Sequence, residues 1–285
     1  MVGDEIRGGG GPAELTPAGL AAGELAAGVR ADYDAAAGDW AGGPGPVYAP
    51  LARALVAAAP VPPAGRLVLD LGAGSGVAGQ AALAAGARQV VGADLSEAML
   101  RHSPGPPRGG GWCPVAADAV ALPFRDGCFD LVLAAFCLNH LGSLAAGLAE
   151  ARRVGAALAA STFAPGWTHP AKDAADGALR SFGYRPPAWY AALTPGSRAS
   201  DPEALAGQAA AAGFTRVRVA TATVPTGLAT PAELASWRLG MAHYAPFLRS
   251  LDPAGRAAVR RAAEQAVAAV AAGPLVVSMV VLTAS

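Results

Sequence analysis

A glycine-rich turn that follows a short apolar run is the part of the sequence best suited to chemistry. The run from Leu67 to Gly76 reads LVLDLGAGSG, with glycines at positions 72, 74 and 76. Glycine lets a strand turn sharply into a helix and lets backbone N–H groups approach a ligand closely. Residues 74–79 also fit the dinucleotide pattern G-x-G-x-x-G. However, Asp70 precedes the first glycine, and its carboxylate would repel a pyrophosphate. The turn therefore favours a ligand that carries a positive charge.

Two further acidic residues follow the next two apolar runs of the sequence. Asp94 ends the run at residues 90–93, and Asp118 follows the short run at residues 115–117. A ligand with the required cation and no phosphate is S-adenosylmethionine, which carries both an ammonium and a sulfonium group. Asp70 thus makes S-adenosylmethionine a better candidate than a dinucleotide for the glycine turn.

In this order and spacing the motifs resemble the class I S-adenosylmethionine-dependent methyltransferases, in particular the small-molecule branch often called type 11. The resemblance covers Leu67 to about Phe163. It includes the segment LPFRD at residues 122–126 and the pair at residues 129–130, which match the family's link into its fourth strand. One departure is that only Gly155 remains of the Pro-Gly-Gly turn that usually precedes the fifth strand, which leaves the start of that strand open.

The resemblance implies a cofactor site for S-adenosylmethionine. Asp70 and the glycines of the turn would cradle its methionine part, Asp94 would bind both ribose hydroxyls, and Asp118 would receive the adenine amino group. Upstream of these motifs, the pair Tyr33-Asp34 looks like the family's aromatic lid over the cofactor. The cofactor-binding residues expected on this basis are Tyr33, Asp70, Gly72, Ala73, Gly74, Gly76, Asp94, Leu95, Met99, Asp118, Ala119 and Ala135.

Simpler structural roles stay open for several of these residues. Asp94 could only cap the helix that follows, although Ser96 could take that role instead. Asp118 could be a turn residue, and Tyr33 could belong to the core or the surface. The glycine turn would also suit a nicotinamide-dependent dehydrogenase of the same fold, an alternative that Asp70 argues against.

The segments around the motifs alternate between short apolar runs and helical patterns. Such alternation predicts a doubly wound, mostly parallel sheet with helices on both faces. Together with the resemblance it gives an α/β, Rossmann-like, seven-stranded sheet with an antiparallel last strand and a helical cap. Strands are expected at residues 67–71, 90–93, 115–117, 129–136, 156–163, 214–224 and 275–282, and helices at 30–40, 47–59, 77–87, 96–102, 144–153 and 201–212.

The chain is expected to form one domain after a short tail. Residues 1–28 are rich in Gly, Ala and Pro without a steady period and predict a flexible tail. Residues 29–285 would form a single methyltransferase domain. Its core would comprise residues of about 60–163 and 201–285, and its cap would come from insertions at about 165–200, expected to be rich in loops, and 225–273, expected to be helical.

Methyl transfer is an in-line displacement at a carbon that the sulfonium already activates, so the protein mainly has to align the reacting atoms. An oxygen or nitrogen acceptor can also need its proton removed, and histidine is the natural base near neutral pH. His140 follows the fourth predicted strand and is the candidate catalytic base. A structural role for His140 is the alternative.

The two insertions carry most of the remaining aromatic residues and histidines. Both leave near the carboxyl edge of the sheet, where ligands of open α/β folds bind, and long excursions of this kind usually have a function. They therefore predict an acceptor pocket for a flat or apolar molecule, with the core of a small cap as the alternative. The residues expected to line it are Trp167, His169, Trp189, Tyr190, His243 and Tyr244.

Composition narrows the class of protein further. The chain has 285 residues, of which 53% are hydrophobic, and its 21 basic and 21 acidic residues balance. That balance argues against a nucleic-acid partner or an anionic membrane surface. The three cysteines form no C-x-x-C motif, so neither a disulfide framework nor a metal site is expected. The N-terminus lacks the pattern of a signal peptide. The uncharged stretch at residues 266–285 is cut by Gly273-Pro274, which favours a helix end and a core strand over a membrane span.

We therefore expect S-adenosylmethionine-dependent methyl transfer to a small organic acceptor in the cytoplasm. A homodimer is a possible oligomeric state. Alanine dominates the composition and lysine occurs once, at Lys172, as in a GC-rich coding sequence. With the large insertions, this bias suggests bacterial specialised metabolism and natural product biosynthesis. The alternatives are a non-methylating cyclase on the same cofactor-binding fold and a noncatalytic binding protein.

Overall fold

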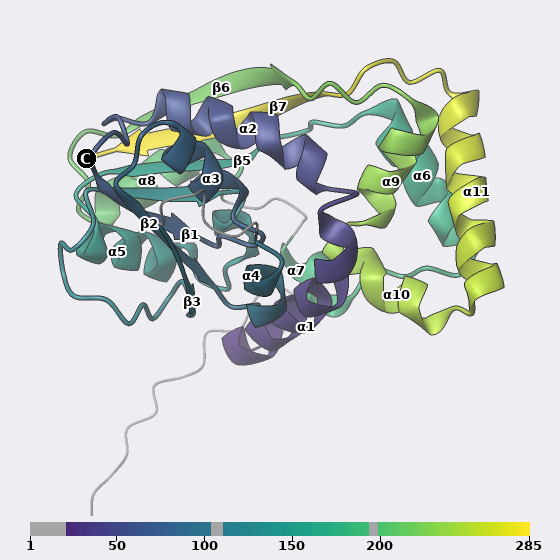
Figure 1. Cartoon of the computed structure of the whole chain (residues 1–285), viewed down its shortest axis with the longest axis horizontal. Helices are drawn as coiled ribbons and strands as arrows, with labels where there is room; N and C mark the ends of the chain where they lie inside the picture. Colours follow the sequence, from purple (N-terminus) through teal and green to yellow (C-terminus); the bar gives the residue numbers. More distant parts are fainter. Residues whose placement is uncertain (1–20, 104–110, 194–198) are drawn as a thin grey trace, which may run out of the picture.

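The structure is a computed structural model that describes residues 21–103, 111–193 and 199–285, and its centre is a seven-stranded sheet (Figure 1). In space the strands follow the order β3-β2-β1-β4-β5-β7-β6. β7 runs antiparallel to both of its neighbours, and the other pairs of adjacent strands are parallel. This confirms the predicted Rossmann-like sheet with an antiparallel last strand. The strands are β1 (Leu67–Leu71), β2 (Gln89–Asp94), β3 (Trp112–Ala116), β4 (Leu131–Ala135), β5 (Leu158–Phe163), β6 (Arg218–Pro225) and β7 (Val276–Ala284).

The middle of the sheet is buried on both faces. β1, β4 and β5 are almost continuously apolar and buried, as parallel strands are when helices cover both sides of a sheet. The order of the strands reverses between β1 and β4, which opens a crevice at their carboxyl ends. That crevice is where the chemistry-bearing motifs meet.

Helices cover the two faces of the sheet. One face packs against α2 (Gly45–Ala58) and α3 (Val77–Ala84), and the other against α5 (Leu144–Val154) and α8 (Pro202–Ala211). Leu51 of α2 and Leu148 of α5 are fully buried in these two layers.

The two insertions build a helical cap at one end of the molecule, where α6, α9 and α11 lie side by side (Figure 1). The first insertion is more helical than predicted. His169 caps α6 with its side chain, Pro170 occupies the first helical position, and Lys172 pairs with Asp176 at 3.1 Å one turn later. The cap consists of α6 (Pro170–Ser181), α7 (Ala188–Leu193), α9 (Pro231–Leu239), the 3-10 turn η2 (Ala242–Tyr244), α10 (Ala245–Ser250) and α11 (Pro253–Ala269).

One long helix, α1 (Ala22–Trp40), connects the cap to the sheet. It packs against α4 (Glu97–Arg101) and also against α7, η2 and α10. The helix begins before the predicted start at residue 30, because burial of Leu25 and Trp40 at its two ends outweighs its internal glycines. Part of the predicted flexible tail is therefore helical, and residues 1–20 of that tail lie outside the described residues.

The remaining differences concern the ends of elements. β3 begins at Trp112 rather than at residue 115, and a 3-10 turn, η1 (Leu138–His140), follows β4. The uncharged C-terminal stretch ends in β7, inside the sheet. In the described part of the chain, none of the helices combines the length and the apolar character that crossing a bilayer requires.

Candidate functional site

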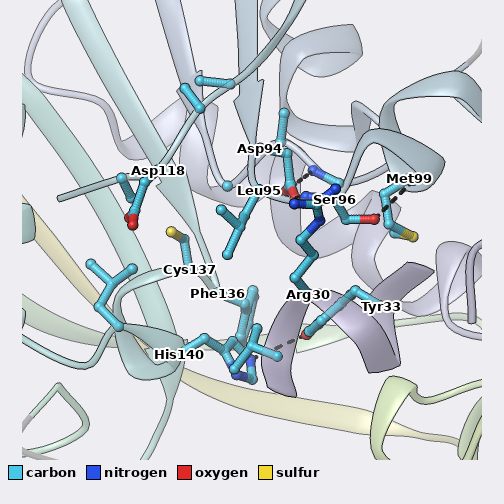
Figure 2. Close-up of a pocket in the computed structure, with 18 of the residues that line it drawn as sticks. Arg30, Tyr33, Asp94, Leu95, Ser96, Met99, Asp118, Phe136, Cys137 and His140 are labelled. Atoms are coloured by element: carbon cyan, nitrogen blue, oxygen red, sulfur yellow. Dashed lines mark hydrogen bonds between the residues drawn. The ribbon is translucent and has the colours of Figure 1, made fainter. Parts of the chain in front are cut away.

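A cavity of about 290 Å³ lies at the carboxyl ends of β1 to β4 and is closed by α1 (Figure 2). Its lining is mostly apolar, but three carboxylates reach it, from Asp70, Asp94 and Asp118. These acids follow three adjacent strands of the sheet, since β1, β2 and β3 are neighbours. Every cofactor-binding residue predicted from the sequence lines this cavity except Gly76.

The glycine turn forms one wall of the cavity. Gly72 and Gly74 have φ values of +67° and +53°, a region that suits glycine. A Cβ atom on Gly72 would lie 2.5 Å from Sγ of Cys137, so only glycine lets the turn pass that close to the chain after β4. Gly76 has a φ of +81°, and a Cβ atom there would meet the ring of Trp112 at 3.1 Å. Gly76 therefore shapes the start of α3 rather than the wall of the cavity.

Asp70 is a buried carboxylate at the end of β1. Its Oδ2 accepts a hydrogen bond of 2.6 Å from the N–H of Gly79, which fixes its position. Burial raises the pKa of Asp70 to about 7, although the Gly79 N–H acts in the opposite direction. A cation beside such a group would favour its ionised form, because the opposite charge offsets the cost of burial. The site thus suits a cationic ligand.

Asp94 is held by two backbone hydrogen bonds, one to each carboxylate oxygen. The N–H of Gly74 donates to Oδ2 at 2.7 Å, and the N–H of Ser96 donates to Oδ1 at 2.8 Å. Ser96 itself caps α4, since its Oγ accepts from the N–H of Met99. The capping role that was open for Asp94 is therefore taken by Ser96. A carboxylate has about four acceptor positions, so Asp94 can still accept bonds from a ligand in the cavity.

Asp118 lies across the cavity from Met99, and Leu95 projects into the space between them (Figure 2). The N–H of Val120 donates to Oδ1 of Asp118 at 3.1 Å, so this residue also shapes its own turn. Ala119 and Ala135 complete the predicted lining on the side of β3 and β4.

Tyr33 and His140 meet on the side of the cavity formed by α1. The phenolic oxygen of Tyr33 lies 3.3 Å from Nε2 of His140, and the two rings pack edge to face. Burial lowers the pKa of His140 to about 4, so its imidazole is neutral at pH 7. Nδ1 of His140 is buried without a hydrogen-bond partner among the described residues. His140 is thus a neutral polar group in an apolar wall.

Three of the predicted acceptor residues continue from His140 into the cap. Trp189 packs 5.9 Å from the His140 ring, and its Nε1 donates to Oδ2 of the buried Asp32 at 2.7 Å. Tyr190 follows Trp189 and stacks on His243 with 3.9 Å between ring centroids. None of the three lines the cavity itself, but they form a continuous aromatic chain that starts at it.

The other three predicted acceptor residues have structural contacts. Nε1 of Trp167 donates to the carbonyl of Val276, and Nδ1 of His169 accepts the N–H of Ala171 at the start of α6. The hydroxyl of Tyr244 donates to Asp176, which also pairs with Arg238. These side chains lie outside the lining of the cavity and stabilise the cap.

Several residues that line the cavity were not predicted from the sequence. Phe136 and Cys137 directly follow β4, so the rule that ligands bind at the carboxyl ends of parallel strands could have identified them. Arg30, Trp40 and Tyr48 come from α1 and α2, which precede the sheet in sequence. No motif identifies them, because they reach the cavity only through the packing of α1 against α4 and the cap helices and of α2 against the sheet.

Comparison with known proteins confirms the resemblance for the part of the chain that carries the motifs. Residues 69–157 match the family described as "Methyltransferase domain", a family whose cofactor is S-adenosylmethionine. A demethylmenaquinone methyltransferase from Corynebacterium kroppenstedtii is 42% identical over 96 residues, which are 33% of this chain and 38% of that relative. The ubiquinone/menaquinone biosynthesis C-methyltransferase UbiE from Acidiphilium cryptum is 44% identical over 93 residues, 31% of this chain and 37% of that relative. The match thus spans well under half of each relative.

Solved structures extend the similarity to most of the fold. A protein from Anabaena variabilis, assigned to the methyltransferases of an antibiotic biosynthesis pathway, matches with a TM-score of 0.55 at 16% identity, over 82% of this chain and 96% of that one. The [4+2]-cyclase SpnF matches with a TM-score of 0.50 at 22% identity, over 82% of this chain and 79% of that one. At these identities the similarity establishes the fold alone.

Proposed function

We propose that this chain is an S-adenosylmethionine-dependent methyltransferase that acts on a small organic acceptor. The observation that carries the proposal is the meeting of Asp70, Asp94 and Asp118 in one cavity at the ends of adjacent strands. The donor set fits the cofactor: a buried carboxylate for an ammonium, a rigidly held one for vicinal hydroxyls, and a third at the far side for an amino group.

When bound, S-adenosylmethionine supplies a methyl group on an electrophilic sulfonium. The work left to the protein is to bind, orient and exclude water. In this proposal Asp94 accepts hydrogen bonds from the ribose hydroxyls, and its two backbone hydrogen bonds keep the carboxylate from rotating. Asp70 neutralises the ammonium, and Asp118 accepts a hydrogen bond from the adenine amino group. Tyr33 closes the cavity from α1, in contact with the rings of Trp40 and His140.

The acceptor in this proposal approaches from the aromatic chain that runs from His140 through Trp189 and Tyr190 to His243. Stacked and edge-to-face rings suit a flat acceptor, and the relatives named above include methyltransferases of quinone biosynthesis, whose acceptors carry such a ring. His140 is the proposed polar contact to the acceptor. With a pKa of about 4 it is a weak base, so an acceptor that already carries an acidic hydroxyl fits best, whether its oxygen or a ring carbon takes the methyl group.

A cytoplasmic enzyme of bacterial specialised metabolism, as a monomer or a homodimer, is the setting that we propose. The alanine-rich composition and the size of the cap support it. A screen of phenols and quinols as methyl acceptors would identify the substrate.

Two measurements test the proposal. Calorimetric titration should show binding of S-adenosylmethionine and S-adenosylhomocysteine in the micromolar range, at about −8 kcal/mol, with no comparable binding of NAD. Incubation with S-adenosylmethionine and reduced short-chain demethylmenaquinone, or with simple phenols, should release S-adenosylhomocysteine. Binding of NAD with neither adenosyl compound bound would overturn the proposal.

A cyclase that uses the cofactor without transferring its methyl group is the second candidate. The weak basicity of His140 favours it, because proton removal from an ordinary alcohol or amine would need a stronger base. Release of S-adenosylhomocysteine in step with product would exclude the cyclase. Turnover that needs the bound cofactor but leaves it unchanged would establish it.

A further inference from the structure

The cavity lining has more negatively than positively charged side chains, although the proposed ligand carries both an ammonium and a carboxylate. The lining holds the carboxylates of Asp70, Asp94 and Asp118, and Arg30 is the only lysine or arginine among the described residues that line it. His140 does not compensate, because burial lowers its pKa to about 4. A carboxylate on the ligand therefore has one positively charged side chain available to it.

Four backbone N–H groups of the glycine turn are already used inside the protein. The N–H groups of Gly72 and Ala73 both donate to the carbonyl of Ala93, at 2.8 and 3.0 Å. The N–H of Gly74 donates to Asp94, and that of Gly76 donates to the carbonyl of Ala73. Four donors that would otherwise bind an anion are thus already engaged inside the protein.

Arg30 lines the cavity next to a short series of hydrogen-bonded residues. Its Nε lies 3.7 Å from Oδ2 of Asp34, one turn further along α1. Asp34 accepts a hydrogen bond of 2.6 Å from Oγ of Ser96, whose own N–H binds Asp94. In Figure 2 the side chain of Arg30 extends from α1 to the region of Asp94 and Ser96.

The contact with Asp34 leaves Arg30 free to bind a second anion. A distance of 3.7 Å exceeds that of a charge-assisted hydrogen bond, about 2.7–2.9 Å, and the Arg30 side chain is 52% exposed. A pair of this kind contributes little on its own, so reorienting the guanidinium toward a ligand costs little. The planar fork of arginine matches a carboxylate with two parallel hydrogen bonds.

We propose that Arg30 binds the carboxylate of the methionine half of the cofactor and thereby selects ligands that carry an amino acid. The inference rests on the proposed function, and it goes beyond it by assigning a residue that lies outside the matched family segment. Arg30 supplies the positive charge, and Asp34, which accepts a hydrogen bond from Ser96, keeps an acidic group beside it when the site is empty.

The test compares two ligands that differ by the amino-acid part. S-adenosylhomocysteine carries it, and 5′-methylthioadenosine lacks it while keeping the adenosine and the sulfur. For Arg30→Ala we expect the Kd of S-adenosylhomocysteine to rise at least about tenfold, the loss of a charge-assisted contact, while the Kd of methylthioadenosine stays within about twofold. Arg30→Lys should lie between, because lysine keeps the charge but not the fork. Arg101→Ala removes the matched exposed pair with Glu97 on α4 and should change neither Kd.

The outcomes separate this inference from the proposed function. Equal losses for the two ligands in Arg30→Ala, or no loss for S-adenosylhomocysteine, would overturn the role of Arg30 and leave the proposed function intact. If the wild-type chain bound neither compound, the proposed function would fail first. As a second readout, the wild-type preference for S-adenosylhomocysteine should shrink as salt is raised, because Arg30 is half exposed, and this effect should be absent in Arg30→Ala.

Discussion

Tyr33 and His140 are separated by 107 residues in sequence, and their side chains lie 3.3 Å apart, from the phenolic oxygen to Nε2. The contact ties α1 to the turn that follows β4, and it lies in the wall of the cavity that we propose as the cofactor site. A helix that precedes the sheet in sequence thus closes a site that the sheet builds.

Removing the Tyr33 ring should weaken cofactor binding more than removing its hydroxyl. Tyr33→Phe keeps the ring contacts with Trp40 and His140, so we expect less than about a threefold rise in the Kd of S-adenosylhomocysteine. Tyr33→Ala opens the wall to water and should raise it at least about tenfold. Calorimetry measures both; equal values for the two variants would refute a closing role of the ring.

Asp94 should affect binding without a matching effect on folding. Asp94→Asn weakens charge-assisted bonds to the ribose worth about 1.5–3 kcal/mol each, so the Kd of S-adenosylhomocysteine should rise at least about tenfold. Asp130→Asn is the matched control, since Asp130 also accepts a backbone N–H, from Leu67, at the opposite end of β1. Thermal unfolding should shift similarly in both variants. An unchanged Kd for Asp94→Asn would reduce this residue to a structural one.

Cofactor affinity should rise with pH until about neutrality. The pKa of Asp70 is about 7 in the free protein, above its ordinary value of 3.8. The ionised form binds an ammonium, so below this pKa binding must first remove a proton, and affinity should fall by up to about tenfold per pH unit. Titrations with S-adenosylhomocysteine between about pH 5 and 8 test this. Asp70→Asn should bind more weakly and without this pH dependence; a sloping profile that persists in the variant would contradict the assignment.

Gly92 should resist substitution, because a Cβ atom there would overlap the ring of Trp112. Gly92→Ala is expected to lower the free energy of unfolding by about 1–3 kcal/mol, the usual cost of overpacking. Gly207→Ala on the exposed side of α8 has open space around it and should raise stability by about 0.5–1 kcal/mol. Urea unfolding of the two variants measures the difference. Equal stability would mean that the Trp112 ring moves aside freely.

The buried pair of Arg238 and Asp176 should hold the cap together. Arg238 donates to Asp176 at 2.9 Å, and the hydroxyl of Tyr244 donates to the same carboxylate at 2.6 Å. Arg238→Met leaves a buried carboxylate without its main partner, which should cost about 3–5 kcal/mol. Arg260→Met, at an exposed arginine of α11, should change stability by less than about 0.5 kcal/mol. A small loss for Arg238→Met, measured by thermal or urea unfolding, would show that the cap does not depend on this pair.

The sequence by itself determined the sheet and the position of the acidic motifs. Short apolar runs alternate with helical patterns, and parallel strands bring their carboxyl ends to one edge, so acids at the ends of successive strands must converge there. Asp70, Asp94 and Asp118 are local features of this kind. Their strand-end positions depend only on residues within a few places in the chain.

Only the tertiary structure decided what faces these acids. The resemblance suggested Tyr33 as a lid, but Arg30 and Tyr33 reach the cavity because α1 packs against α4 and the cap helices, and no local spacing relates them to Asp94 or His140. The same holds in the cap, where His169 caps a helix whereas Trp189 extends the aromatic wall from His140. The pKa values of Asp70 and His140 follow from burial, which depends on contacts between segments far apart in the chain. Such contacts have no period or motif in the sequence, so the fold alone determines them.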